Sequence, residues 1–357
     1  LDDVRTRGDR AVFDYERKFD ATELTADNFR VSEEEIAAAY EAVPPELLES
    51  LKKAIRNIYE YHSRAGRRDN LVTKDGRTTG YVVRPVSSAG IYAPGGTAPL
   101  SSSVLMGVLP AKAAGVERIV LATPAKGGTV APLTLVAAKE CGVSEIYKMG
   151  GAQAIAALAY GTESVKKVDV IAGPGNIYVT LAKKEVYGEV GIDMLAGPSE
   201  IMIVADGTAE PAYVAADMLS QAEHDVLARA IVVTTSRVLA EKVSAQVRQQ
   251  LAELPRAEVA RRSLEAGGGI IVVKTLEEAC DLVNAVAPEH LELYTRDPQD
   301  LLPLVRNAGA VFLGGYTPEP VGDYFAGPDH ILPTSGSAKF FQVLNEDIFT
   351  RKMSVIS

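Results

Sequence analysis

The first 70 residues carry hydrophobic positions at the spacing of amphipathic helices. Ser32 and Glu35 form the pattern of a capping box before an apolar run. A second helix is predicted from Pro45, because its apolar stripe comprises Leu47, Leu48, Leu51, Ile55 and Ile58. His62 falls at the end of this helix among polar neighbours, and this position predicts a surface residue.

From Tyr81 onward, short strand-like apolar runs alternate with helical patterns. The first series of predicted strands covers 81–85, 118–122, 145–148 and 168–172. The second series covers 200–204, 230–234, 270–273, 291–294 and 310–313. This alternation predicts βα units, and therefore two successive α/β modules with mainly parallel sheets. Two such modules are common in dinucleotide-dependent enzymes.

Composition narrows the class of protein. The chain has 357 residues and a formal charge of -10, which argues against a nucleic-acid or anionic-membrane binder. No apolar run approaches the roughly 20 residues of a spanning helix. Cys141 and Cys280 lie in apolar helical patterns, so we expect reduced core thiols. We expect a cytoplasmic enzyme that acts on small molecules. The sequence begins at Leu1 directly with a charged helical pattern, which suggests that it is part of a longer protein.

Three glycine-rich turns precede predicted helices in the first module, at 90–96, 150–151 and 173–176. Each could present backbone N–H groups to a phosphate. The closest dinucleotide fingerprint, Gly173-x-Gly175-x-x-Tyr178, lacks its third glycine. Ordinary βα turns therefore explain these segments equally well. Side chains at or just after the turns could contact a nucleotide, namely Tyr92, Gln153 and Asn176.

Candidate chemistry in the second module begins with the segment 220–225. Gln221 and His224 are three residues apart, so one helical face could present both to a metal ion. A solvated helix end is the alternative explanation. Ser199 directly precedes a predicted strand, where it is either a substrate contact or part of a turn that starts the strand.

Two further motifs add carboxylates and imidazoles. Glu289 and His290 lie between a helix and a strand, where a histidine and an adjacent carboxylate could transfer protons. Such a pair also occurs by chance. Asp323 and His330 fall in a glycine-rich segment. Three of the four histidines thus lie in short polar motifs flanked by glycine or proline, which argues against scattered surface residues.

Seven motifs in order give the chain a family resemblance. They are GIYAPGG, GGAQAIAALAYGT, GPGN, AGPSE, SQAEHD, APEHLE and GDYFAGPDHILPTSG. The chain resembles the histidinol dehydrogenases, which use zinc and NAD in the last step of histidine biosynthesis. The resemblance implies an aldehyde-dehydrogenase-like α/β fold with two incomplete Rossmann-like modules.

The resemblance also implies domains and an assembly. An N-terminal helical segment at 1–80 would pack on the second module. The NAD-binding module would cover 81–196, the substrate and zinc module 197–332, and the start of a dimerisation tail 333–357. The expected assembly is a homodimer with shared active sites.

Site residues follow from the matching motifs. The zinc ligands would be Gln221, His224 and Asp323, and the catalytic pair would be Glu289 and His290. The NAD contacts would be Tyr92, Gln153 and Asn176. The substrate contacts would be Ser199, Gln221, His224, His290, Asp323 and His330. The family takes a fourth zinc ligand from a histidine in the partner's C-terminal tail. No histidine follows His330 in the printed sequence, so we expect an incomplete site in this chain as given.

The expected reaction is the NAD-dependent oxidation of L-histidinol to L-histidine through L-histidinal. Three alternatives stay open. The substrate could be another small amino or sulfonated alcohol. The chain could be a zinc hydrolase with Glu289 as general base, or a silent fragment that keeps only the fold and ligand binding.

Overall fold

The computed structural model describes residues 1–64, 66, 68–95 and 100–357. Gly96 of the GIYAPGG motif lies outside the described residues. The chain divides into two compact units. Unit 1 comprises Leu1–Leu195, Tyr324–Ile331 and Leu344–Ser357, and unit 2 comprises Ala196–Asp323 and Leu332–Val343. In the described ranges, no helix is long and apolar enough to cross a lipid bilayer.

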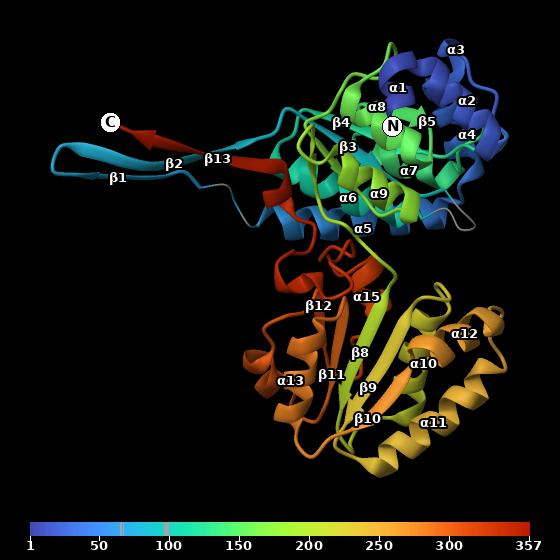
Figure 1. Ribbon diagram of the computed structural model, residues 1–357, viewed down its shortest axis with the longest axis vertical. Helices are drawn as coiled ribbons and strands as arrows, with labels where there is room; N and C mark the ends of the chain where they lie inside the picture. Colours follow the sequence, from blue (N-terminus) through green and yellow to red (C-terminus); the bar gives the residue numbers. More distant parts are fainter. Residues whose placement is uncertain (65, 67, 96–99) are drawn as a thin grey trace. The chain divides into compact units, whose positions relative to one another are not determined.

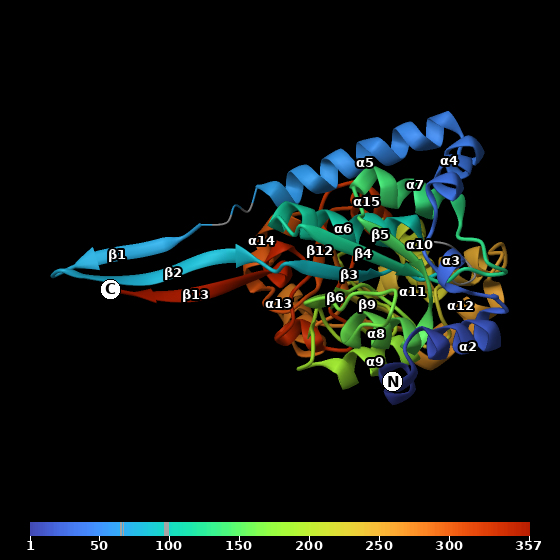
Figure 2. The same cartoon turned by 90° about the horizontal axis from the view of Figure 1, so that it is seen from above.

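Unit 1 contains a five-stranded parallel sheet with the strand order β5-β4-β3-β6-β7. Helices α6 and α7 cover one face and α8 and α9 the other (Figure 2). Its elements up to α9 are α1 Asp2–Arg7, α2 Asp9–Asp20, α3 Ala26–Phe29, α4 Glu33–Ala42, α5 Pro45–Ser63, β1 Asn70–Lys74, β2 Arg77–Pro85, β3 Ser88–Tyr92, α6 Ser101–Ala114, β4 Arg118–Thr123, α7 Pro132–Cys141, β5 Glu145–Lys148, α8 Gly151–Tyr160, β6 Val170–Ala172 and α9 Ile177–Val186. The remaining ones are β7 Gly191–Ile192, η3 Glu346–Phe349 and β13 Thr350–Ile356. The predicted turn at 90–96 is corrected in its first part, because Gly90, Ile91 and Tyr92 belong to β3, the central strand of this sheet.

Unit 2 repeats this design. Its five parallel strands have the order β10-β9-β8-β11-β12, with α10, α11 and α12 on one face and α13 on the other (Figure 1). Its elements are β8 Glu200–Ala205, α10 Pro211–Ala222, β9 Arg229–Thr234, α11 Arg237–Leu251, α12 Ala257–Gly267, β10 Gly269–Val272, α13 Leu276–Val286, β11 His290–Tyr294, α14 Pro298–Leu301, η1 Leu302–Leu304, β12 Ala310–Leu313, α15 Glu319–Tyr324 and η2 Ser337–Lys339. The βα series predicted for the second module is confirmed, as are the first-module strands near 118–122, 145–148 and 168–172. The predicted strand 81–85 is a correction, because it belongs to β2, which pairs antiparallel outside the parallel sheet. Cys141 and Cys280 are free buried thiols, as expected.

A three-stranded antiparallel arm, β1-β2-β13, extends from unit 1 (Figure 2). All five residues of β1 are exposed. Parallel strands covered on both faces form continuous apolar runs, whereas this arm has no buried face that would give its sequence such a pattern. That is why β1 and β13 were not predicted.

The N-terminal helices pack on unit 1, which corrects our expectation that they would cover the second module. Helices α1 and α2 contact α8, and α4 and α5 contact α7 and α6. The ring of Phe29 packs against Phe13 at 5.1 Å and Tyr147 at 5.2 Å between centroids. An apolar stripe predicts that a helix is covered, but it does not specify which surface covers it.

His62 is buried, so the prediction of a surface residue was wrong. Its side chain lies between Glu346 and Asp329, with Nδ1 at 3.1 Å from Glu346 Oε2 and Nε2 at 3.9 Å from Asp329 Oδ2. Burial lowers the pKa of His62, and Glu346 opposes this shift. Both partners come from segments more than 260 residues away, which local sequence context cannot reveal.

We expect His62→Ala to destabilise unit 1 by about 2–4 kcal/mol, because it leaves a cavity and removes the hydrogen-bond partner of the half-buried Glu346 carboxylate. Thermal unfolding would measure the loss. The exposed Glu60→Ala on the same helix is the control, with an expected change within about 0.5 kcal/mol. Equal effects of the two substitutions would contradict a structural role for His62.

Candidate active site

The candidate catalytic residues of unit 2 lie at the amino ends of β8 and β11, which pair in parallel. Ser199 directly precedes β8, and Glu289 directly precedes β11. The backbone N–H of Glu200 donates to Glu289 Oε2 at 2.8 Å. The pairing of the two strands therefore brings together motifs that are 90 residues apart in sequence.

The contacts of His290 assign the roles of its two ring nitrogens. Nδ1 lies 3.1 Å from the carbonyl oxygen of Glu200, which can only accept a hydrogen bond. Nδ1 therefore carries the hydrogen, and Nε2 offers a lone pair. Nε2 is buried, has no hydrogen-bond partner and lies 3.9 Å from Asp323 Oδ1. Burial lowers the pKa of His290, and the charge of Glu319 and the hydrogen bond to Glu200 oppose this shift only in part. The imidazole is arranged as a neutral proton acceptor.

Three elements each contribute two polar residues to this region at a spacing that puts both on one face. Ligand atoms of His290, Glu319 and Asp323 all lie within 4.8 Å of one another. Electrostatic interactions connect Asp217 to Glu292 and both to Glu319. The three pairs are Asp217 and Gln221 on α10, His290 and Glu292 on β11, and Glu319 and Asp323 on α15.

The carboxyl groups in this region are costly to bury. Burial raises the pKa of Glu289 well above its ordinary value. It does the same for Glu292, where the charge of Asp217 adds to the shift, and it raises the pKa of Asp217 to about 6. Within the described ranges, Glu289, Glu292 and Glu319 form no ion pair with lysine or arginine. A proton or a bound cation must therefore compensate these groups.

Gln221 provides the structural test of a metal site. Its side chain is 0% exposed, yet both amide atoms lack a hydrogen-bond partner. Such a group costs free energy unless a ligand satisfies it. His224 is exposed just beyond the end of α10. Its backbone N–H donates to the backbone carbonyl oxygen of Gln221 at 3.2 Å. With Asp323, these residues supply the nitrogen and oxygen donors that zinc accepts, so the residues fit the metal.

The expected NAD contacts lie in unit 1 around the carboxyl ends of β3 and β6. Tyr92 ends β3, and Gly173 follows β6. The strand order reverses between these two neighbouring strands. In such sheets, the crevice at this point is the usual dinucleotide-binding site. Gly173 has φ +122°, and a Cβ there would lie 2.1 Å from the Tyr92 carbonyl oxygen, so only glycine fits.

The other two expected NAD contacts lie at the starts of the helices that follow β6 and β5. Asn176 is exposed and caps α9, accepting from the N–H groups of Tyr178 and Val179 at 3.0 and 3.1 Å. Gln153 is buried in the first turn of α8. His330 is half-buried and belongs to unit 1, whereas His290 belongs to unit 2.

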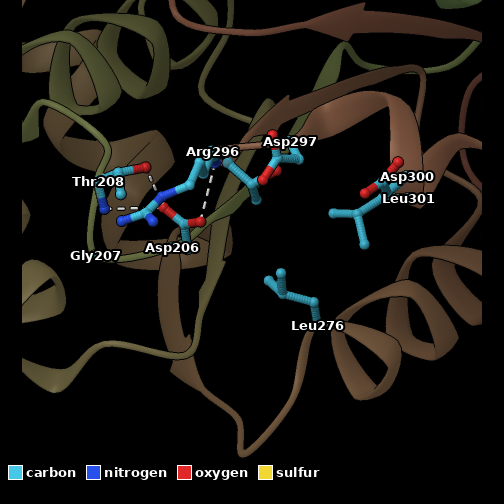
Figure 3. Close-up of a pocket in the computed structure, with 9 residues that line it drawn as sticks. Asp206, Gly207, Thr208, Leu276, Arg296, Asp297, Asp300 and Leu301 are labelled. Atoms are coloured by element: carbon cyan, nitrogen blue, oxygen red, sulfur yellow. Dashed lines mark hydrogen bonds between the residues drawn. The ribbon is translucent and has the colours of Figure 1, made fainter.

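A cavity of about 540 Å³ lies at the carboxyl ends of β8 and β11 (Figure 3). No predicted site residue lines it, and its lining includes Asp206, Thr208, Leu276, Arg296, Asp300 and Leu301. At about 3.3 Å per residue, the length of these strands separates it from the cluster around His290 by roughly 17 Å. Unit 2 therefore places its candidate chemistry at the ends of the strands opposite to this cavity.

Comparison with known proteins decides the family. The family model described as histidinol dehydrogenase matches residues 1–357. The chain belongs to the histidinol dehydrogenase family. It is 54% identical to the histidinol dehydrogenase of Heliobacterium mobile, over 100% of this chain and 84% of that protein. The expected family is confirmed.

Solved structures agree with this assignment. The histidinol dehydrogenase of Elizabethkingia anophelis has a TM-score of 0.96 at 40% identity, covering 100% of this chain and 82% of that one. An acetylating aldehyde dehydrogenase from Geobacillus thermoglucosidasius has a TM-score of 0.58 at 14% identity, with 100% and 98% covered. The second match shows the fold alone and confirms the aldehyde-dehydrogenase-like α/β class. Histidinol dehydrogenases are NAD-dependent, metal-using oxidoreductases that catalyse the last step of histidine biosynthesis.

Four acidic residues of this region were not predicted from the sequence, namely Glu200, Asp217, Glu292 and Glu319. Asp217 lies four residues before Gln221, and Glu319 four before Asp323, a spacing that places each pair on one helical face. In a chain with 47 acidic residues, however, such pairs are too frequent to be informative without tertiary contacts.

We expect Gln221→Leu to stabilise the metal-free protein by about 1–3 kcal/mol, because it removes a buried amide without partners. Zinc should then raise the thermal midpoint of the wild type but not that of the variant. Both effects can be measured by thermal unfolding, first with a chelator and then with added zinc.

The matched control is Gln250→Leu, because the Gln250 amide donates to the Ala212 carbonyl oxygen at 2.9 Å. This substitution should not stabilise the protein, and zinc should still do so. If Gln221→Leu is less stable than wild type in chelator, the amide has partners and the interpretation is wrong.

Proposed function

We propose that this chain catalyses the NAD-dependent, four-electron oxidation of L-histidinol through L-histidinal to L-histidine. The observation that best supports this is the His290 imidazole, oriented by the Glu200 carbonyl and presenting an unpaired Nε2 to a cluster of buried polar groups. In a family of dehydrogenases, an oriented neutral base is what removal of an alcohol proton requires. Family membership argues against the hydrolase alternative.

His290 has the proton-accepting role in the first oxidation. Its Nε2 takes the hydroxyl proton of histidinol as a hydride leaves the carbinol carbon for NAD. The hydrogen bond from Nδ1 to the Glu200 carbonyl keeps the ring in one orientation and stabilises the imidazolium that forms.

Glu289 acts in the second oxidation. Burial raises the pKa of this carboxyl group well above its ordinary value, which makes the carboxylate a stronger base than an exposed one. It removes a proton from the water that attacks the aldehyde carbon. The resulting hydrate then loses the second hydride to a second NAD.

Binding roles are proposed for the other residues. Gln221, His224 and Asp323 would hold zinc, which supplies a template for the imidazole and amino nitrogens of the substrate. Ser199 and His330 would contact the substrate, as would the ligand residues and His290. Tyr92, Gln153 and Asn176 would bind NAD, whose expected place is supported by the strand order of unit 1.

We further infer a cytoplasmic homodimer with shared active sites. Support comes from the arm β1-β2-β13, which exposes the apolar side chains Leu71, Val72, Met353 and Ile356. Such side chains on an extended sheet are commonly covered by a partner.

The direct test is the stoichiometry of NADH formation by the full-length protein with limiting L-histidinol and zinc. Two NADH per histidinol support the proposal, because both oxidations then occur. Activity only with another small amino or sulfonated alcohol would replace the substrate. No NADH from any of these alcohols would refute a dehydrogenase.

We expect Glu289→Gln to slow L-histidinal oxidation by roughly 10²–10⁴, the usual contribution of a general base, and L-histidinol oxidation much less. The two half-reactions can be compared by starting from each substrate under single-turnover conditions. The exposed Glu253→Gln should change neither rate. Comparable slowing of both half-reactions would contradict the separate roles of Glu289 and His290.

A further inference from the structure

A buried carboxyl group from α2 lies at the start of α8. Glu16 is completely buried, and its Oε1 accepts from the Gly150 N–H at 2.8 Å and from Gln153 Nε2 at 2.9 Å. Gly150 precedes the first residue of α8, and this helix has no cap from its own side chains. A carboxylate at this end satisfies an unpaired N–H group and interacts favourably with the helix dipole.

The same contact fixes the side-chain amide of Gln153. The Glu16 oxygen accepts hydrogen bonds, so the Gln153 NH2 group must face it. The carbonyl oxygen of Gln153 then lies on the other side, where a Cβ on Gly151 would be 2.9 Å from it. The next backbone N–H, of Gly151, donates to the Tyr92 hydroxyl oxygen at 3.1 Å. Glu16, Gln153 and Tyr92 thus form one connected network.

Burying a carboxyl group at the start of α8 costs free energy. Burial raises the pKa of Glu16 to about 7, and Asp20 adds to the shift while the hydrogen bonds from Gly150 and Gln153 oppose it. Glu16 Oε2 is buried without a hydrogen-bond partner, and Glu16 forms no ion pair with a basic side chain in the described part of the chain. Groups that cost stability in this way often serve function.

Glu16 is not needed simply to anchor α2 to the rest of unit 1. Asp9, on the same helix, already fixes α2 to the segment after α8. Its carboxylate accepts from Ser164 Oγ at 2.6 Å, and its N–H donates to Glu163 Oε2 at 2.8 Å. Asp9 and Glu16 are both buried, but only Glu16 contacts a residue proposed to bind NAD.

We propose that Glu16 is a positioning residue of the NAD site, which caps α8 and holds Gln153 so that its carbonyl oxygen faces the cofactor. Gln153 then acts as a hydrogen-bond acceptor, for a ribose hydroxyl or an amide N–H of NAD. This inference rests on the proposed NAD-binding role of Gln153 and Tyr92.

The test compares Glu16→Ala with Glu16→Gln and with the matched control Asp9→Asn. A lost hydrogen bond to a charged group reduces affinity by roughly tenfold or more, so Glu16→Ala should raise the Kd and KM for NAD by at least that factor. The kcat at saturating NAD and the KM for histidinol should stay within about twofold, because the chemistry is in unit 2. Glu16→Gln keeps an acceptor oxygen and should restore most of the affinity. Asp9→Asn should lower the thermal midpoint without changing the Kd for NAD, measured by isothermal titration calorimetry.

A double-mutant cycle with Gln153→Ala separates the possible outcomes. If Glu16 acts through Gln153, the double variant should bind NAD no more weakly than Gln153→Ala alone. Additive losses would overturn the positioning role, as would an unchanged Kd in Glu16→Ala. Absence of NAD binding by the wild type would instead contradict the proposed function. If Glu16→Ala does not fold, Glu16→Asp is the variant to use instead. It keeps the negative charge but moves the acceptor oxygen away from Gln153, so it should also weaken NAD binding.

Discussion

The constraint on which unit 2 depends is the burial of carboxyl groups without basic partners. Glu289, Glu292 and Glu319 are all buried, and none pairs with lysine or arginine in the described ranges. Removing such charges from water costs several kcal/mol each unless a proton or cation compensates. The fold nevertheless holds them rigidly, because each belongs to or directly precedes a regular element. Beside them, Gln221 and His290 have buried polar atoms without partners. Together, these costs support the proposed ligand site in unit 2.

The two units share one strand order, but their candidate sites lie at opposite ends of the strands. In unit 1 the expected NAD contacts Tyr92 and Asn176 lie at the carboxyl ends of β3 and β6, where the strand order reverses, and Gln153 lies in α8 after β5. In unit 2 the corresponding ends, after β8 and β11, border the cavity of about 540 Å³, and the candidate chemistry lies at the amino ends. Helices run antiparallel to the strands they connect, so the end of α10 also reaches this side. Asp217, which lies one turn before Gln221 on this helix, interacts with Glu292 of β11. The strand-order rule thus agrees with the expected cofactor site in unit 1, but it does not indicate the candidate catalytic residues of unit 2.

The sequence predicted those features that depend on local interactions or that lie in long motifs. Buried parallel strands form apolar runs, so β4, β5, β8 and β9 could be predicted almost to the residue. The motifs identified the family and the pair Glu289–His290. What could not be predicted depends on distant partners. His62 is buried beside Glu346, which lies 284 residues later in the chain, and Glu319 lies near His290 through the packing of α15. The strands of the arm could not be predicted for a different reason. They have no buried face that would give their sequence an apolar pattern.

The difference between the polar networks of the two units bears on what each must bind. Glu16 is buried, as is Glu289, but two N–H donors of the protein itself satisfy its Oε1, although its Oε2 has no hydrogen-bond partner. The Gln153 amide is therefore held in one orientation before any ligand arrives, and under the proposal it presents a fixed acceptor to NAD. In unit 2, Glu292 Oε1 and both amide atoms of Gln221 have no hydrogen-bond partner. A divalent cation together with a nitrogen-rich substrate has the chemistry that would satisfy these groups. Under the proposed function, the NAD site of unit 1 is therefore largely formed before its ligand binds, whereas the polar groups of unit 2 are satisfied only by their ligand.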